Sequence, residues 1–320
     1  MKKFLSLLAV AVLAIVLVAC GNDEGENATD EGKEDTNVET VSVTHELDNE
    51  AVEVKKNPEN VVVFDFGSLD TMAALGLEDH IVGLPQATVP AYLKQFKDEK
   101  YQNLGSLKEP DFEAIHAAKP ELIIISARQA DLYDQFKEIA PTIYLNMEYE
   151  NTLESFESNV TTIAEIFDKE DEAKAELAKV EEKIATVKEK AEASDEKGLI
   201  VLGTEGKVSA YGPASRFGLV HDVLGVTPAD ENIESSRHGQ SITYEYILET
   251  NPDVLYIIDR DAAIGNGASV KDSIENDLVK KTNAFKNDKM IYLDGEVWYL
   301  ASGGLESMNI MVDEVAEGLE

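Results

Sequence analysis

The chain has 320 residues, of which 43% are hydrophobic and one is cysteine, and its formal net charge at pH 7 is −35. Single hydrophobic cores stop growing near about 250 to 300 residues, so this length supplies enough apolar material for two cores. The charge argues against nucleic acid or an anionic membrane surface as a direct partner. The lone cysteine excludes an intrachain disulfide and a cysteine-based metal cluster.

Residues 1–19 have the pattern of a sorting signal. Lys2 and Lys3 precede an apolar run that ends at Ala19, and Cys20 follows. The sequence LVAC at 17–20 resembles the lipobox of bacterial lipoproteins, in which the cysteine sulfur carries a diacylglycerol and the signal is cut before it. We therefore expect a lipoprotein signal peptide over 1–19 and lipidation of Cys20. A retained transmembrane helix is the alternative.

Residues 20–40 are small and acidic, with few large apolar side chains. Such a segment cannot bury enough apolar surface to order itself. We expect a flexible tether that holds the folded part roughly 25 Å from the lipid anchor.

Residues 41–151 alternate between strand and helix patterns. Residues 41–54 resemble two short paired strands, and the apolar run NVVVFDF at 60–66 is typical of a buried strand in a parallel sheet. A helix from about Ser68 to Leu75 is expected to end at Gly76, which suits a helix C-terminus. The alternation predicts an α/β fold, with an N-terminal lobe over 41–151.

Residues 152–197 contain neither Pro nor Gly and are rich in Ala, Glu, Lys and Leu. An apolar stripe recurs at spacings of three and four, which predicts one long amphipathic helix that joins two bodies. A coiled coil is the alternative, but the stripe lasts only about two heptads. The stripe residues are Leu177, Val180, Ile184, Val187 and Ala191.

Two segments on either side of this helix match each other. In each, a Glu-x-Ile helix ends before a Pro, an apolar strand follows, and an arginine comes eight residues after the Pro. The matched pairs, each separated by 132 residues, are Glu113 and Glu245, Pro120 and Pro252, and Arg128 and Arg260. We therefore predict a related C-terminal lobe over 198–320. The whole is expected to be two Rossmann-like lobes with mostly parallel sheets, joined by one long helix, with a ligand cleft between them.

Only four of the 28 Lys and Arg residues are arginines: Arg128, Arg216, Arg237 and Arg260. A guanidinium is suited to bidentate contact with a carboxylate or another planar anion. Arg128 and Arg260 follow equivalent strands, at the sheet edge where ligands bind in open α/β folds. These positions predict an anionic ligand, and ordinary surface ion pairs are the alternative.

Three loops of the C-terminal half carry further candidates, namely residues 211–218, 238–240 and 298–304. Their Tyr, His, Trp and Arg side chains are typical of loops that line the entrance of a ligand-binding site, although a lone His is more often structural. The patterns Gly-x-Ser-x-Gly, His-Glu-x-x-His and the Walker loop are absent from the sequence. No nucleophile is indicated, so we do not predict an enzyme.

The order of lipobox, acidic tether, lobe, long helix and lobe resembles the helix-linked solute-binding proteins of iron-siderophore, haem and cobalamin ABC importers. The resemblance covers about Val41 to Glu320 and includes the repeats PDFEAI, KPELII and EYILETNPD. Narrower motifs are similar to the catecholate and petrobactin-binding subgroup. They are ISARQ ending at Gln129, ASRFGLVHDVLG around Arg216, RHGQS from Arg237, DRDAAIG around Arg260, and WYLASG from Trp298.

The resemblance implies roles for particular residues. Arg128, Arg216 and Arg260 would converge on an anionic ferric catecholate, with Arg237 and Trp298 as further ligand contacts. His238 and Tyr299 would complete the coordination of Fe(III) when the siderophore supplies only four donors, since this hard ion suits phenolate oxygen and imidazole also binds iron. With a hexadentate siderophore these two residues would be contacts outside the coordination shell.

The resemblance also implies the function. It predicts a monomeric, lipid-anchored extracytoplasmic protein, without a cofactor of its own, that delivers an Fe(III)-catecholate siderophore such as petrobactin to an ABC permease and its ATPase. Glu113 and Glu245 would meet arginines on the two permease subunits. Haem, cobalamin or a hydroxamate siderophore remains an alternative ligand, and a secreted enzyme or an adhesion lipoprotein is the alternative of another class.

Overall fold

The computed structural model describes residues 39–265 and 269–320. The predicted signal peptide, the lipidation of Cys20 and nearly all of the predicted tether lie outside these residues. The described chain begins with an antiparallel pair of strands, β1 (Thr40–Val43) and β2 (Val52–Lys55), as the sequence predicted.

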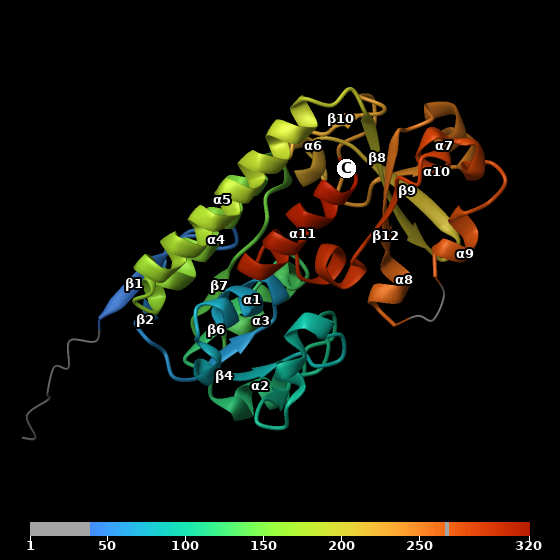
Figure 1. Ribbon diagram of the computed structural model, residues 1–320. Helices are drawn as coiled ribbons and strands as arrows, with labels where there is room; N and C mark the ends of the chain where they lie inside the picture. The colour runs from blue at the N-terminus through green and yellow to red at the C-terminus, as the bar shows by residue number, and fades with distance from the viewer. Residues whose placement is uncertain (1–38, 266–268) are drawn as a thin grey trace, which may run out of the picture. The chain divides into compact units, whose positions relative to one another are not determined.

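A five-stranded parallel sheet forms the N-terminal lobe (Figure 1), in the order β5-β4-β3-β6-β7. Its central strands β3 and β6 are buried along their whole length, which explains their uninterrupted apolar sequences. The strands are β3 (Val61–Val63), β4 (Ile81–Leu84), β5 (Gln102–Asn103), β6 (Leu122–Ile125) and β7 (Thr142–Tyr144). The helices are α1 (Phe66–Ala74), α2 (Phe112–Ala118) and α3 (Tyr133–Lys137), with 3-10 turns η1 (Glu78–His80), η2 (Ala91–Lys97), η3 (Ala130–Leu132) and η4 (Tyr149–Asn151).

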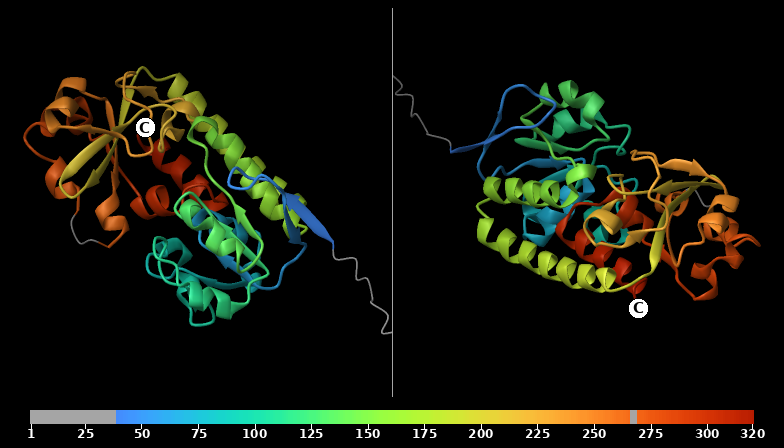
Figure 2. Two further views of the ribbon diagram at one scale, coloured as in Figure 1. Left: turned by 180° about the vertical axis from the view of Figure 1, so that it is seen from behind. Right: turned by 90° about the horizontal axis from the view of Figure 1, so that it is seen from above.

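The helix predicted over 152–197 is two helices, so the prediction of one unbroken helix there was wrong. They are α4 (Thr152–Ile166) and α5 (Glu170–Glu192), which fold back on each other and lie side by side (Figures 1 and 2). The break falls at Asp168, whose φ is +52°. The Asp168 carboxylate holds this conformation by accepting hydrogen bonds from Lys56 at 2.5 Å and Asn57 at 2.6 Å. The long helix that leads from one sheet to the other is therefore α5, and its predicted apolar stripe does face the core.

A six-stranded mixed sheet forms the C-terminal lobe, in the order β11-β9-β8-β12-β13, with β10 also paired to β8. Strands β8, β12 and β13 are parallel, whereas β9 pairs antiparallel with β8, and β11 pairs antiparallel with β9 at the edge of the sheet. The strands are β8 (Lys197–Thr204), β9 (Lys207–Tyr211), β10 (Thr227–Pro228), β11 (Gln240–Ile242), β12 (Val254–Asp259) and β13 (Met290–Leu293). The helices are α6 (Leu219–Asp222), α7 (Tyr244–Thr250), α8 (Arg260–Ala263), α9 (Lys271–Ile274), α10 (Asn283–Lys286) and α11 (Leu305–Glu317), with the 3-10 turn η5 (Val279–Lys281) and the π-helical turn η6 (Glu296–Leu300).

The sequence repeat is also a structural repeat. Helices α2 and α7 each begin at a residue whose side chain accepts a backbone N–H, Asp111 in α2 and Thr243 in α7. Each ends at a residue in the left-handed region, Lys119 with φ +48° and Asn251 with φ +47°. A central parallel strand follows in both lobes. The two halves therefore have the same helix–strand unit at equivalent positions.

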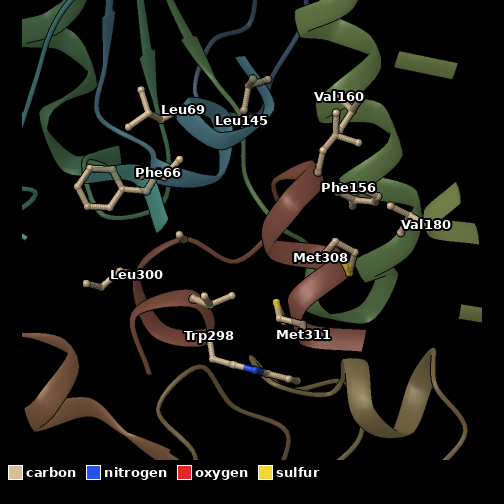
Figure 3. Close-up of a cluster of buried hydrophobic side chains, with 14 of the residues drawn as sticks. Phe66, Leu69, Leu145, Phe156, Val160, Val180, Trp298, Leu300, Met308 and Met311 are labelled. Atoms are coloured by element: carbon tan, nitrogen blue, oxygen red, sulfur yellow. The ribbon is translucent and has the colours of Figure 1, made fainter. Parts of the chain in front are cut away.

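One hydrophobic cluster runs through both lobes (Figure 3). It includes Phe66 and Leu69 of α1, Val180 of α5, and Met308 and Met311 of α11. Helix α11 thus packs on α1 and on α5, although it comes from the C-terminal part of the chain. Among residues 39–265 and 269–320, no helix is both long enough and apolar enough to cross a membrane.

Candidate functional site

Tyr299 lies among three guanidinium groups. The Cζ atoms of Arg216, Arg260 and Arg128 lie 4.3, 5.4 and 5.7 Å from the centre of its ring. Arg216 donates Nη2 to the Tyr299 carbonyl oxygen at 2.7 Å, and Arg128 donates Nη2 to the same oxygen. Arg260 donates Nε to the Tyr299 hydroxyl at 3.0 Å. The structure thus brings three of the four arginines together, from both lobes, and we call these four residues the arginine–tyrosine cluster.

The members of the cluster come from strand ends, a loop and a helical turn. Arg128 follows β6, and Arg260 begins α8 directly after β12, so both lie at the carboxyl ends of central strands. Arg216 lies in the loop before α6, and Tyr299 lies on η6. Single π-helical turns occur often at functional sites, because they re-aim a side chain without ending the element.

The charges of the cluster shift one another's pKa values. Burial acts to raise the pKa of Tyr299, but the hydrogen bond from Arg260 and the positive charges of the three arginines together lower it below its ordinary value. Burial and the nearby charge of Arg216 lower the pKa of Arg128 to about 10. The hydrogen bond to Tyr299 raises the pKa of Arg260. At neutral pH Arg128 and Arg260 remain cationic, and they favour the ionised form of the Tyr299 hydroxyl.

A small cavity of about 50 Å³ lies beside the cluster. Ligand sites for drug-sized molecules usually enclose roughly 300 to 1,000 Å³, so this cavity is smaller than a typical ligand site. Arg128, Arg216 and Arg237 line the cavity. Arg260, Tyr299 and His238 do not line it, and His238 is exposed, so neither of the two predicted iron ligands faces this cavity.

Polar residues of the N-terminal lobe also line the cavity, and the sequence analysis missed them. They are Asp65, Ser68, Asn146, Tyr149 and Asn159. Asp65 follows β3 and Asn146 follows β7, so both lie beyond the carboxyl ends of parallel strands. Their place at the carboxyl ends of parallel strands could have predicted them from the sequence, because the same criterion identified Arg128.

Trp298 was predicted as a ligand contact, and the structure places it in the core instead. Its side chain is 0% exposed, and its Nε1 donates to Oε2 of Glu314 at 2.6 Å. Figure 3 shows it below Met311, within the hydrophobic cluster. Trp298 precedes Tyr299 on η6, so the two side chains point in different directions, and Trp298 packs beneath the turn that carries Tyr299.

The candidate iron donors are individual side chains, without a preformed metal cluster around them. Across the described ranges, no three His, Cys, Asp or Glu side chains are grouped so as to hold a metal ion. The Tyr299 hydroxyl oxygen is the donor that fits Fe(III) best, because a hard ion prefers an anionic oxygen.

The two glutamates predicted for docking occupy equivalent places. Glu113 lies in the first turn of α2 and Glu245 in the first turn of α7, and both are exposed. Each is therefore free to meet a cation on a partner.

Comparison with known proteins agrees with this architecture. A family model described as periplasmic binding protein matches residues 61–297. The chain belongs to this family. The petrobactin-binding protein YclQ of Bacillus subtilis (strain 168) is 53% identical over 320 residues, which cover 100% of both chains.

Solved structures of family members extend the match to three dimensions. The crystal structure of YclQ gives a TM-score of 0.87 at 55% identity, over 88% of this chain and 99% of that one. The iron uptake ABC transporter substrate-binding protein PiuA of Streptococcus pneumoniae gives 0.82 at 42% identity, over 87% and 98%. The catecholate-siderophore binding protein VctP of Vibrio cholerae gives 0.81 at 33% identity, over 87% and 99%. The predicted family and α/β fold class are confirmed.

Proposed function

We propose that this protein captures a ferric catecholate siderophore, petrobactin or a related bis-catecholate, outside the cytoplasm and delivers it to an ABC permease. The observation that carries the proposal is the arginine–tyrosine cluster, which gathers three cations from two lobes in a chain of net charge −35. The names of YclQ, VctP and PiuA support the ligand class and the transport role.

Charge is the basis for preferring a catecholate. Catecholate complexes of Fe(III) carry more negative charge than hydroxamate complexes, and guanidinium groups form charge-assisted hydrogen bonds to such oxygens. Among the described residues, Arg260 pairs with Asp261 at 3.6 Å and Asp65 attracts Arg128, but the three guanidiniums still repel one another. Holding them together around a neutral ligand would be costly, because like charges repel in a partly buried site.

The test is a titration of the protein with ferric petrobactin. Binding is monitored through the fluorescence of Trp298, the only tryptophan in the chain. We expect quenching, because Trp298 lies next to Tyr299 and packs against Phe217. Quenching by a ferric hydroxamate or by haem, with no response to any ferric catecholate, would overturn the ligand class.

Substitution of the arginines is the first specific prediction. Arg128→Ala, Arg216→Ala and Arg260→Ala should each weaken ferric petrobactin binding by roughly 1.5 to 3 kcal/mol, the contribution of a hydrogen bond to a charged group. Isothermal titration calorimetry would measure it. Lys207→Ala is the control, since it removes an exposed cation of β9 outside the cluster. An equal loss of affinity in Lys207→Ala would show that the effect comes from net charge alone.

Direct contact with iron is a separate prediction. With a tetradentate catecholate, Tyr299→Phe should change the visible charge-transfer spectrum of the complex, because a phenolate donor is lost. His238→Ala should change it as well, provided that the exposed loop at His238 closes over the ligand. Spectra identical to that of the wild type would show that neither side chain coordinates the metal.

Anchoring and docking complete the proposal. A monomer held to the membrane by a lipid on Cys20 would present Glu113 and Glu245 to arginines of the two permease subunits, which work with their ATPase. The double variant Glu113→Gln/Glu245→Gln should bind siderophore normally and lose iron uptake in cells. Glu249→Gln, on the exposed face of α7, is the matched control. Normal uptake by the double variant would contradict the docking role.

A further inference from the structure

Behind the arginine–tyrosine cluster, one carboxylate holds η6 at two points. Oε2 of Glu314 accepts a hydrogen bond from Nε1 of Trp298 at 2.6 Å, and Oε1 accepts one from the backbone N–H of Asp294 at 3.0 Å. Trp298 lies inside η6, whereas Asp294 lies just before it. Glu314 itself belongs to α11, which packs on α1 and α5.

These two attachments determine where Tyr299 lies. The backbone N–H of Trp298 also donates to the carbonyl oxygen of Asp294 at 2.9 Å, and Oδ1 of Asp294 accepts from the N–H of Glu296 at 2.9 Å. With Asp294 and Trp298 fixed, the backbone of η6 has little freedom. The carbonyl oxygen of Tyr299, which Arg128 and Arg216 both contact, is part of that backbone.

Trp298 reaches a second member of the cluster through packing. Its ring lies 6.3 Å from the ring of Phe217, edge to face, and the Cζ of Arg216 lies 5.3 Å from the Phe217 ring. A shift of the indole would therefore move both the support of Arg216 and the turn that carries Tyr299.

The surroundings of Glu314 do not account for a charged residue at this place. No described Lys or Arg forms an ion pair with it, and Asp294 and Glu317 add negative charge nearby. Burial, opposed by the bond from Trp298, raises the pKa of Glu314 to about 7. A partly buried carboxylate without a cation destabilises the fold relative to a neutral residue, so stability alone gives no reason for it.

We propose that Glu314 is a positioning residue of the ligand site, which holds η6 so that Tyr299 meets the guanidiniums of both lobes, without touching the ligand. The inference rests on the proposed function and adds a residue to its site. Both carboxylate oxygens are needed, because each accepts from a different donor.

The test compares three single variants and one double variant with the wild type. Glu314→Gln keeps one acceptor oxygen and turns an NH₂ group toward the other donor, so the affinity for ferric petrobactin should fall about ten-fold. Glu317→Gln removes the same charge from the same helix and should bind as the wild type does. Trp298→Phe keeps a ring but removes the indole N–H, and should reproduce the loss. The double variant Glu314→Gln/Trp298→Phe should lose no more affinity than the weaker-binding single variant, because both substitutions disrupt the same hydrogen bond between Trp298 and Glu314.

Two measurements separate this role from a purely structural one. Binding is measured by isothermal titration calorimetry, which does not depend on Trp298, well below the melting temperature of each variant. The emission maximum of Trp298 is recorded without ligand in the variants that retain it, where Glu314→Gln should shift it and Glu317→Gln should not. Unchanged affinity in Glu314→Gln, or an unchanged emission maximum, would overturn the positioning role. Failure of the wild type to bind any ferric catecholate would instead overturn the proposed function.

Discussion

At the scale of single residues, Asp70 shows how a buried carboxylate joins the two lobes. Asp70 lies on α1 and is 1% exposed, and its oxygens accept the backbone N–H groups of Ser307 at 2.7 Å and Glu306 at 3.1 Å, in the first turn of α11. The N-terminus of a helix carries a partial positive charge, which offsets part of the cost of burying this carboxylate. Gly304 permits the approach, since a Cβ there would lie 2.2 Å from Oδ2 of Asp70.

The pKa of Asp70 makes stability depend on pH. Burial raises it to about 6, although the bonds from Ser307 and Glu306 act to lower it. Between about pH 4 and pH 6 the folded protein therefore holds a proton that the unfolded chain has released. The free energy of unfolding should fall by about 3 kcal/mol as pH rises through this window.

Urea denaturation of wild type and Asp70→Asn across this range would measure the effect. Asparagine does not titrate, so the variant should lack the contribution of Asp70 to the slope and have a shallower pH dependence than the wild type, whatever its absolute stability. Parallel curves for the two proteins would show that Asp70 is not the group responsible.

At the scale of elements, the break between α4 and α5 depends on a contact that the local sequence does not reveal. Asp is tolerated in the left-handed region, but the segment IFDKED has no Gly or Pro to end a helix. The deciding partners, Lys56 and Asn57, lie more than a hundred residues away in the sequence. Helix propensity alone therefore predicted one helix where two are present.

Substitution at Asp168 tests this explanation. Asp168→Ala should lower the urea midpoint, because alanine is strained at positive φ and loses both hydrogen bonds. Asp168→Asn should lower it less, because asparagine tolerates the conformation and still accepts a bond. Lys174→Ala, on the exposed face of α5, serves as the control. Equal midpoints for the alanine and asparagine variants would contradict a role for the left-handed conformation.

The same reasoning explains which parts of the site the sequence revealed. Arg128 and Arg260 were predictable, because rare arginines followed strands at equivalent points of a repeat. Trp298 was misplaced, because its sequence position beside Tyr299 gives no sign of which one faces the core. Glu314 was missed, because one Glu among the charged residues of an amphipathic helix has no distinguishing pattern until the fold brings Trp298 and Asp294 to it.

At the scale of the whole described unit, the continuous core limits how far the lobes can move. The cluster in Figure 3 joins α1, α5 and α11, so a wide hinge opening would expose apolar surface. We expect a lobe rotation of at most about 10 degrees between empty and loaded forms, as is usual where no flexible hinge exists. Small-angle X-ray scattering with and without ferric petrobactin would measure it, and a large compaction would contradict the prediction.

The four arginines also have a consequence for the rate at which ligand arrives. An anionic ferric complex approaching from solution first meets the field of a chain of net charge −35, and only within about 10 Å does it meet the cationic cluster. Added salt screens the long-range repulsion more than the short-range contacts. The association rate constant in stopped-flow fluorescence should therefore rise with ionic strength, which is the reverse of electrostatic steering. A rate constant that falls with salt would mean that the local field of the arginines dominates the encounter.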